Sequence, residues 1–217
     1  MRATFCAYLA YAALDPWSLQ VRTMSDDPIT AHLEEIVIGE IAPAKIVIVD
    51  YDPGWPGRFR KEAQRIRAAL GCHAKAVEHI GSTAVPGLAA KPIIDILLVV
   101  ADPRDESTYL PALENAGYVL RIREPDFHEH RMLRTAQQDV HVHVFAADCP
   151  QVERYLLLRD RLRHEAAERA LYAQTKRKLA ARDWPTTQHY AEAKSEVIEE
   201  IIGRAMAAKS GHGNPRQ

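Results

Sequence analysis

Three things are scarce in this 217-residue chain: cysteine, net charge and long apolar runs. Cys6, Cys72 and Cys149 stand far apart without a C-x-x-C pair, which argues against a disulfide scaffold or a cysteine zinc site and favours a reducing compartment. The 28 basic and 29 acidic residues leave a formal net charge of -1, so no global field attracts nucleic acid or a membrane surface. No run approaches the roughly 18 apolar residues of a membrane-spanning helix. We therefore expect a soluble, cytoplasmic protein.

The two ends of the chain are predicted to lie outside the folded part. The opening "MRATFCAYLAYAALDPWSLQVRTM" weakly imitates a secretory signal, and the alternative is an over-extended start ahead of Met24. We expect residues 1–28 to be disordered or over-extended, and the polar residues 209–217 to form a disordered tail. The remaining residues, 29–208, have the length of a single domain with one core.

Apolar periodicity and turn residues divide that domain into elements. Helical spacing of Phe59, Ala63, Ile66 and Leu70, with Gly71 as a stop, predicts a helix over 52–71. Other patterns predict helices over 28–39, 102–117, 151–182 and 186–209, and strands over 45–50, 74–80, 92–100, 118–122, 128–134 and 139–145. A body of strands and helices followed by long helices indicates an α/β (α+β) fold, with a mixed sheet, flanking helices and a helical C-terminal portion.

The stretch "EHIGSTAVPGLAAKPIIDILLVV" carries the first candidate site. A Gly-Ser turn that leaves a strand can direct backbone N–H groups and a hydroxyl at a phosphate, so Gly81 and Ser82 are candidates. Asp95 then places a carboxylate on an apolar strand, where it can hold a divalent metal beside that phosphate. Five residues separate Gly81 from Gly87, so this loop is not a P-loop. The competing interpretation is a tight turn followed by an aspartate at a strand edge.

Histidines recur at alternate positions on two predicted strands. In "DVHVHVF", Val140, Val142 and Val144 share one face, and the other face carries Asp139, His141, His143 and Phe145. The two imidazoles can share a metal or phosphate, or one can act as a general base; an exposed polar face is the alternative. His128 and His130 repeat the spacing, and the short link at 135–138 predicts a hairpin that would bring both pairs together.

The C-terminal helices carry a basic surface. Arg159 and Arg163 lie one turn apart, and "YAQTK" and "YAEAK" each place a tyrosine one turn before a lysine, Lys176 or Lys194. Such groups can bind a triphosphate. A solvated helix face with ion pairs four residues apart is the alternative interpretation.

Four blocks in this order resemble the GrpB family: "YDPGWPGRFRKEAQRI", "HIGSTAVPGLAAKPIIDI", "HVHVF" and the helices with "LRDRLR", "YAQTK" and "YAEAK". The resemblance extends from Val47 to Ile202. It implies a nucleotidyltransferase-like fold. Members of the family occur alone and as a C-terminal extension of some bacterial dephospho-CoA kinases, for which a folding-accessory role has been proposed. This chain has no P-loop, so it is not itself such a kinase.

Transfer of the superfamily pattern onto these residues implies one site. The pattern gives Asp95 as the first metal carboxylate. The shared strand face then offers His141 and His143 as catalytic partners and Asp139 as a second metal ligand. Mg²⁺ is the implied ion. The residues expected on the phosphate or nucleotide side are Gly81, Ser82, Thr83, Lys91, Arg159, Arg163, Lys176, Tyr190 and Lys194. The chain departs from the pattern at Leu97, where active nucleotidyltransferases usually carry a second carboxylate.

Three functions follow from these patterns. The leading hypothesis is that the chain binds a nucleotide or another phosphorylated small molecule with Mg²⁺, with nucleotidyl transfer as the accompanying reaction. The alternative, motivated by Leu97, is a non-catalytic accessory or interaction module with a protein partner. A metal hydrolase based on the two His-x-His pairs is the third.

Overall fold

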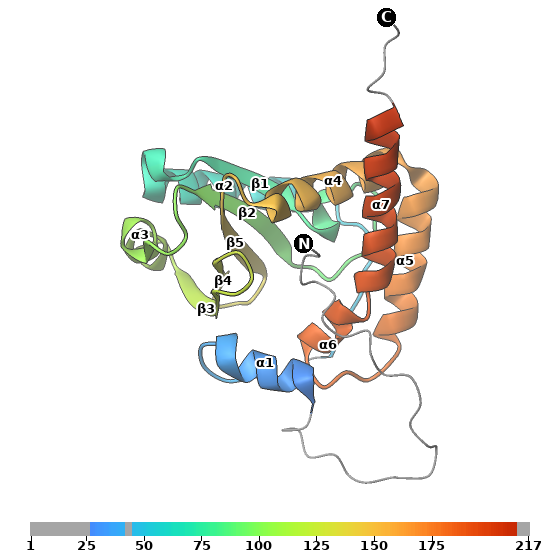
Figure 1. Ribbon diagram of the computed structural model, residues 1–217, viewed down its shortest axis with the longest axis horizontal. Coiled ribbons are helices and arrows are strands. Elements are labelled where there is room, and N and C mark those ends of the chain that lie inside the picture. The colour runs from blue at the N-terminus through green and yellow to red at the C-terminus, as the bar shows by residue number, and fades with distance from the viewer. Residues whose placement is uncertain (1–26, 42–44, 212–217) are drawn as a thin grey trace, which may run out of the picture.

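The computed structural model describes residues 27–41 and 45–211, which form a layered body and a helical lobe (Figure 1). The helices are α1 (Pro28–Ile36), α2 (Trp55–Leu70), α3 (Leu110–Asn115), α4 (Pro150–His164), α5 (Ala166–Ala180), α6 (Thr187–Glu192) and α7 (Ser195–Gly211). The strands are β1 (Ala76–Ile80), β2 (Ile94–Val100), β3 (Tyr118–Glu124), β4 (His130–Thr135) and β5 (Val140–Ala146). Short 3-10 turns include η3 (Ser82–Ala84) and η4 (Glu106–Thr108). No helix among the described residues is long and apolar enough to cross a membrane.

The five strands form one mixed sheet in the order β1-β2-β5-β4-β3. The central pair β2 and β5 is parallel, and the other neighbours are antiparallel. The predicted mixed α/β class is thereby confirmed, as is the β4–β5 hairpin. The parallel register sets Asp95 opposite His141 and Leu97 opposite His143, so these four side chains share one face of the sheet.

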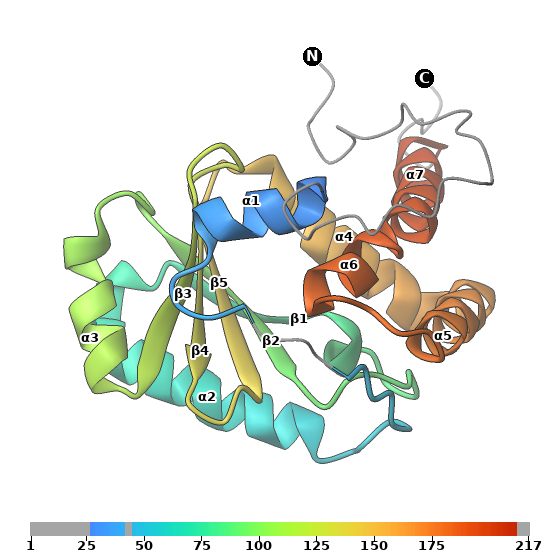
Figure 2. The ribbon, with the colours of Figure 1, turned by 90° about the horizontal axis from the view of Figure 1, so that it is seen from below.

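One face of the sheet is covered by α2 and α3, and the other faces α1 and α4 (Figure 2). The side chains between the sheet and α2 form the main apolar core, which includes Ile96, Leu98, Val142 and Val144 with Ile66 of the helix. All five are fully buried. Because alternate strand residues point to opposite faces, the valines of "VHVHV" complete this core and direct the two histidines to the α4 side.

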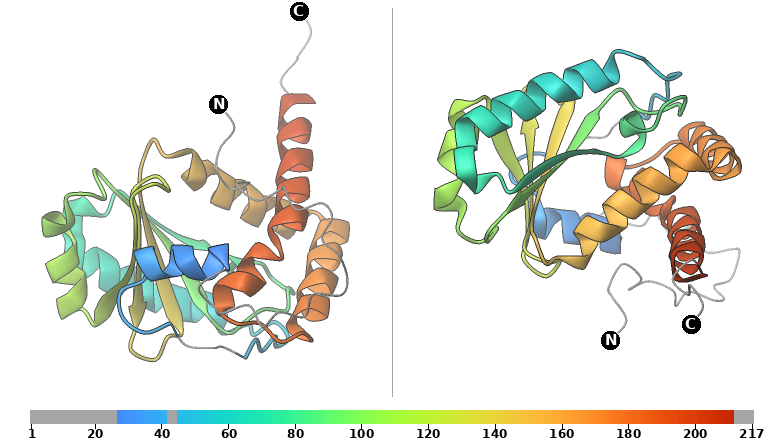
Figure 3. Two further views of the ribbon diagram at one scale, coloured as in Figure 1. Left: turned by 60° about the horizontal axis from the view of Figure 1, so that its bottom comes forward. Right: turned by 90° about the horizontal axis from the view of Figure 1, so that it is seen from above.

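A smaller apolar cluster lies on the α4 side. Leu97, Val99 and Phe145 are buried there against Tyr155 and Leu156 of α4. Leu97, which stands where a second carboxylate was sought, has no exposed surface. Figure 3 shows α4 leading away from this face to α5 and α7, which pack beside one another as the helical lobe.

The C-terminal helices are more divided than their sequence pattern suggests. The predicted helix 151–182 breaks at Glu165, whose extended backbone separates α4 from α5. Neither proline nor glycine marks this break, so the helical pattern alone did not reveal it. The second segment divides into α6 and α7, and α7 continues to Gly211, beyond the expected boundary at 208. Residues 1–26 and 212–217, to which most of the predicted termini belong, lie outside the described residues.

One predicted element is wrong, and another is shorter than predicted. Residues 45–50 form no strand; their one ladder contact is an isolated bridge between Val49 and Ala90. The predicted helix 102–117 shrinks to the turn η4 and the six-residue α3, because Pro111 lies in the first turn of α3 and limits where the helix can begin. Residues 45–50 pack instead with the helical lobe, where Ile46 and Ile48 cluster with Leu179 and Tyr190. Such tertiary contacts outweigh the β-branched content that predicted a strand.

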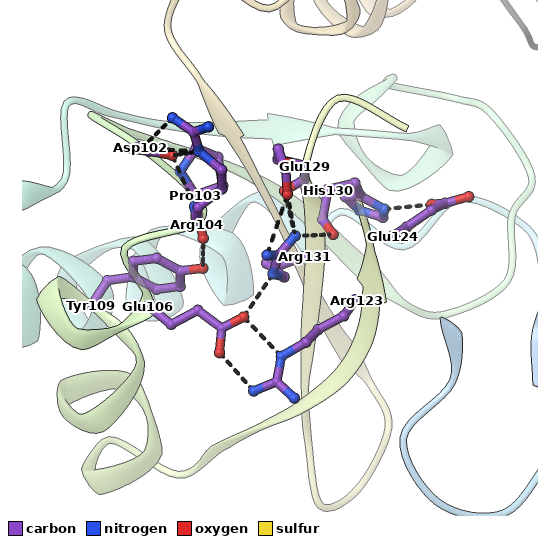
Figure 4. A network of polar contacts seen from close by, with 10 residues as sticks. All are labelled: Asp102, Pro103, Arg104, Glu106, Tyr109, Arg123, Glu124, Glu129, His130 and Arg131. Atoms are coloured by element: carbon purple, nitrogen blue, oxygen red, sulfur yellow. Dashed lines mark hydrogen bonds and ion pairs between the residues drawn. The ribbon is translucent and has the colours of Figure 1, made fainter. Parts of the chain in front are cut away.

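The far edge of the sheet is held by a polar network (Figure 4). The guanidinium of Arg131 on β4, almost fully buried, donates to Glu106 of η4 at 2.7 Å, and Glu106 also pairs with Arg123 of β3 at 2.6 Å. These pairs hold the pKa of Glu106 below its ordinary value, against the effect of burial. The network ties η4 to the sheet and reaches the backbone carbonyl of His130 on β4.

Candidate functional site

Asp95 lies at the start of β2, opposite Ile80 of the edge strand β1. Gly81 follows Ile80 in the chain, and its backbone has φ 68° and ψ -169°, a region that is nearly exclusive to glycine. A Cβ at Gly81 would come within 2.4 Å of Asp95 Oδ2. The sequence analysis expected Gly81 to contact a phosphate. In the structure, the missing side chain of Gly81 instead leaves space for the carboxylate of Asp95.

His141 and His143 face the same carboxylate from β5. The Oδ1 atom of Asp95 lies 3.6 Å from His141 Nδ1 and 3.8 Å from His143 Nε2. The three potential ligand atoms are all within 4.8 Å of one another, and each side chain is partly exposed. Among the described residues, these three side chains form the one group of His, Cys, Asp or Glu that could hold a metal ion. It agrees with the sequence prediction of Asp95, His141 and His143 as one group.

The histidines also control the charge state of Asp95. Burial alone would raise the pKa of the Asp95 carboxyl, but the neighbouring imidazoles, that of His141 first, outweigh burial and lower the pKa. Asp95 is therefore ionised at neutral pH and available as an anionic ligand.

Asp139, the other predicted metal ligand, lies elsewhere. Its Oδ2 accepts from Arg58 of α2 at 2.8 Å, and its Oδ1 accepts from the Thr135 hydroxyl at 2.7 Å. Asp139 precedes the first residue of β5, where the strand alternation that would direct it toward His141 has not begun. It closes the β4–β5 hairpin against α2 and is not part of the cluster.

Lysines from the lobe and from the β1–β2 connection gather at Ser82 and Tyr190, near this cluster. The ammonium group of Lys176 donates to Ser82 Oγ at 2.9 Å and to the carbonyl of Ala89. Lys194 and Lys91 lie over the ring of Tyr190, at 4.5 and 5.7 Å from its centroid. The expected group of Ser82, Lys91, Lys176, Tyr190 and Lys194 is therefore brought together.

The repeated Tyr-x-x-x-Lys pattern produces the same contact twice. Lys176 lies 4.8 Å from the ring centroid of Tyr172, one turn before it on α5, as Lys194 does with Tyr190. Such cation–π contacts stabilise an ammonium group that has lost part of its water. Tyr172 was noticed in the sequence only as part of this repeat.

The electrostatics of the lysines reflect crowding around one carboxylate. Burial lowers the pKa of Lys176 to about 7, with Lys194 and Arg177 adding and Asp95 opposing. Burial lowers the pKa of Lys194 to about 8, with Lys91 adding and Asp95 opposing. The pKa of Lys91 is lowered by burial and raised by Asp95. The three ammonium groups thus have Asp95 in common and Lys194 also faces Glu192, so positive charge is in excess here and favours an anionic ligand.

Tyr190 adds an unsatisfied polar group. Its hydroxyl is buried and has no hydrogen-bond partner among the described residues, although its ring is flanked by Lys91 and Lys194. Buried polar atoms are nearly always paired with protein, water or ligand. The hydroxyl is a further point at which a ligand can be held.

Thr83 is placed differently from the expectation. Its side chain is almost fully buried, and its hydroxyl donates to the carbonyl of Ile93 at 3.0 Å while lying 3.1 Å from His79 Nε2. Because that hydroxyl donates its hydrogen to Ile93, His79 Nε2 is the donor in the second bond. Thr83 thus joins η3 to the start of β2 and does not face the lysines.

Arg159 and Arg163 are separated from the lysines by η3. Arg159 pairs with Glu78 at 2.9 Å and Asp160 at 2.7 Å, and Arg163 donates to the carbonyl of Ala84 at 2.9 Å. With Arg60, they line a pocket of about 360 Å³ beside the open edge of β1. The sequence predicted one phosphate-binding group of arginines and lysines, but the structure separates the two kinds of residue. Arg159 and Arg163 already donate hydrogen bonds to acceptors within the protein.

Comparison with known proteins places the chain. The sequence profile described as GrpB protein matches residues 45–204. The chain belongs to the GrpB family. A UPF0157 protein of Halalkalibacterium halodurans is 52% identical over 178 residues, covering 81% of this chain and 91% of that protein. The crystal structure of the conserved protein GrpB from Enterococcus faecalis superimposes with a TM-score of 0.68 at 32% identity, covering 75% of this chain and 99% of that one.

A dephospho-CoA kinase of Mycolicibacterium paratuberculosis is 38% identical over 82 residues, which cover 36% of this chain and 20% of that protein. GrpB membership thus confirms the resemblance drawn from the four sequence blocks. The narrower nucleotidyltransferase-like fold stays a prediction.

The donor set of this GrpB chain fits some metals better than others. Two imidazole nitrogens and one carboxylate suit Mn²⁺, Fe²⁺ or Zn²⁺, whereas Mg²⁺ prefers oxygen ligands. Leu97 is buried in an apolar cluster and Asp139 is engaged with α2, so neither adds an oxygen. The expected Mg²⁺ is therefore a poor fit to the residues present.

Sequence reasoning missed one participant. Glu124, at the end of β3, pairs with His130, which in turn lies 3.1 Å from His143. His130 and His143 come together through the predicted hairpin, but His128 does not: it is exposed in the preceding turn with φ 55°. No local pattern marks Glu124, because its partner is set by strand pairing.

Proposed function

We propose that this GrpB-family protein binds a phosphorylated small molecule, nucleotides included, at a divalent metal held by Asp95, His141 and His143. The observation that carries the proposal is the gathering of three partly or fully buried lysines at Ser82 and Tyr190, near the cluster of Asp95, His141 and His143. Ammonium groups suit phosphate oxygens. A divalent metal bound there would supply Lewis-acid stabilisation of a phosphoryl group.

Each group of residues has its own task in this proposal. Lys91, Lys176 and Lys194 neutralise phosphate charge, and Ser82 is oriented by its bond to Lys176. The buried hydroxyl of Tyr190 gains a partner from the ligand. The nitrogen-rich donor set favours Mn²⁺ or Zn²⁺ over the Mg²⁺ expected from the resemblance.

The proposal concerns binding, and nucleotidyl transfer remains a prediction from family resemblance. Two-metal transfer needs several carboxylates to hold the ions. Apart from Asp95, the described cluster contains no carboxylate.

Isothermal titration calorimetry tests the proposal in two steps. Mn²⁺, Zn²⁺ and Mg²⁺ are titrated into the wild-type protein, Asp95→Asn and the control Asp139→Asn; we expect binding to be lost in Asp95→Asn alone. ATP, AMP and inorganic phosphate are then titrated into the metal-loaded protein and into Lys176→Met, which should bind at least tenfold more weakly.

Two results would contradict the proposal. Equal metal binding in Asp95→Asn would remove the metal centre, and no heat with any phosphate compound would remove the ligand class. If neither step gives heat and a protein partner co-purifies with both wild type and Asp95→Ala, the non-catalytic interaction module is the better description.

A further inference from the structure

A chain of hydrogen bonds runs from Glu124 to the candidate metal ligands. Glu124 Oε2 lies 3.0 Å from His130 Nδ1 (Figure 4), and His130 Nε2 lies 3.1 Å from His143 Nδ1. The other nitrogen of His143, Nε2, faces Asp95. Three strands contribute to this chain: Glu124 comes from β3, His130 from β4 and His143 from β5.

The direction of each hydrogen bond follows from its first acceptor. Hydrogen bonds from His130 and His32 lower the pKa of Glu124, against the effect of burial, so the carboxylate is ionised and only accepts. His130 Nδ1 therefore carries a hydrogen. The His130 ring is almost fully buried, and its Nδ1 hydrogen is directed at Glu124, so the neutral imidazole offers Nε2 as an acceptor. The hydrogen in the next bond then belongs to His143 Nδ1.

That assignment leaves a lone pair on His143 Nε2. This nitrogen is 3.8 Å from Asp95 Oδ1, so two acceptors face the same small volume. Two acceptors at such a distance repel one another unless a cation or a proton lies between them. The arrangement is that of a metal-ligating histidine, which typically donates its other N–H to a protein acceptor.

The His130 ring is held rigidly. It is 6% exposed and stacks on Phe145, with centroids 4.7 Å apart and planes 10° from parallel. Its plane is also within 9° of that of His143. Both of its nitrogens have partners, so rotation of the ring would leave buried polar atoms unpaired.

We infer that Glu124 and His130 are positioning residues that fix His143 in its Nδ1–H tautomer and so present Nε2 to the metal. The inference rests on the proposed metal centre. It extends that centre to the opposite edge of the sheet, and then to α1, because the second oxygen of Glu124 lies 3.0 Å from His32 of that helix. Helix α1 lies outside the residues matched by the family profile.

The first test reads the tautomer without any metal. Long-range ¹H–¹⁵N correlation spectra of metal-free protein distinguish the Nδ1–H and Nε2–H forms of each histidine, and the spectrum of His143→Gln identifies the signals of His143. We expect the Nδ1–H form in the wild type and a mixture in His130→Phe, which keeps the aromatic stack but lacks the acceptor. An Nε2–H form in the wild type, or no change in His130→Phe, would overturn the inference.

The second test measures affinity for Mn²⁺ and Zn²⁺ by calorimetry. Loss of such a supporting hydrogen bond weakens metal binding about 10- to 100-fold. His130→Phe should show this loss, His130→Gln should recover most of it because its amide oxygen can accept from His143, and the exposed control His128→Phe should match the wild type. Equal affinity in His130→Phe and wild type would contradict the inference.

The two proposals can fail separately. If the wild type binds no metal yet shows the Nδ1–H tautomer, the metal centre fails and the orientation of His143 stands. If it binds metal with His143 in the Nε2–H form, the metal centre stands and the positioning role fails. Thermal unfolding of each variant confirms that the compared proteins are folded.

Discussion

The two faces of strands β2 and β5 are built from the same segments but have opposite characters. Toward α2 they present Ile94, Ile96 and Leu98 of β2, all fully buried in the main core. Toward α4 the same strand presents Asp95, with His141 and His143 beside it, all partly exposed. One face excludes water along its whole length, whereas the other gathers charge at Asp95 and becomes apolar from Leu97 onward.

The comparison indicates which residues stabilise the fold and which are retained at a cost. An apolar face gains free energy from burial, at roughly 25 cal/mol for each Å² removed from water. Partly buried lysines and an aspartate lose hydration, which must be offset by partners. On the α4 face these partners are incomplete, since three lysines have Asp95 in common and the Tyr190 hydroxyl has none among the described residues.

The largest effect on stability is expected on the apolar face. Leu98→Ala removes a fully buried side chain from the core and should lower the free energy of unfolding by about 3 kcal/mol. Chemical denaturation measures this loss. Mn²⁺ affinity of the folded variant should be unchanged, since Leu98 points away from Asp95; a parallel loss of metal binding would show that the two faces are not independent.

Gly81→Ala should lower both the stability of the fold and the affinity of the site for metal. Its Cβ would lie 2.4 Å from Asp95 Oδ2, in a backbone region nearly closed to alanine, so we expect a loss of about 2 kcal/mol and much weaker metal binding. Gly87→Ala is the control: Gly87 also has positive φ, but nothing lies within 4 Å of its Cβ position. It should lose about 1 kcal/mol and keep its metal affinity. Equal metal affinities in the two variants would contradict this role of Gly81.

Acid should destabilise the protein through His79. Burial lowers the pKa of His79 to about 4, with Asp95 opposing and Arg163 and Arg159 adding. The unfolded chain therefore takes up this proton first, and stability is lost as the pH falls from about 6.5 toward 4.

At pH 5.5 the contribution of His79 is a loss of about 1.5 kcal/mol relative to pH 8. Urea denaturation of wild type and His79→Gln at both pH values isolates it. The variant should lose correspondingly less stability on acidification; identical pH dependence would show that His79 is protonated in the folded state.

The smallest effect is expected to have the opposite sign. Lys194→Met removes a charge whose pKa is lowered by burial and by Lys91, so the variant should be about 1 kcal/mol more stable at pH 7. Its affinity for phosphate compounds should fall about tenfold. Thermal unfolding and calorimetry measure the two changes, and a destabilised variant would indicate that Lys194 is fully compensated within the protein.

The local sequence pattern predicted which residues lie on the polar face, but it did not predict the contacts that those residues make. Alternation placed His141 and His143 on one side of β5, and the parallel register, which pattern does not specify, set Asp95 beside them. The sequence identified the Gly-Ser turn but not the close approach of Gly81 to Asp95. That approach depends on the pairing of β1 with β2. The GrpB blocks identified Lys176 and Lys194, whereas the division between lysines and arginines depends on how η3 is placed between them.

Residues outside regular alternation were the least predictable. Asp139 is two residues before His141, the spacing that places side chains on one strand face, but it precedes β5. Spacing alone therefore could not predict its hydrogen bond with Arg58. Glu124 acquires its role only through two successive strand pairings, β3 with β4 and β4 with β5.

The measurement that most directly tests the account is an anomalous difference map from crystals of the wild-type protein grown with Mn²⁺. The account predicts one strong peak between Asp95, His141 and His143, within coordination distance of their nitrogen and oxygen atoms, and none in Asp95→Asn crystals. No peak at this cluster, or a peak at Asp139, would contradict it.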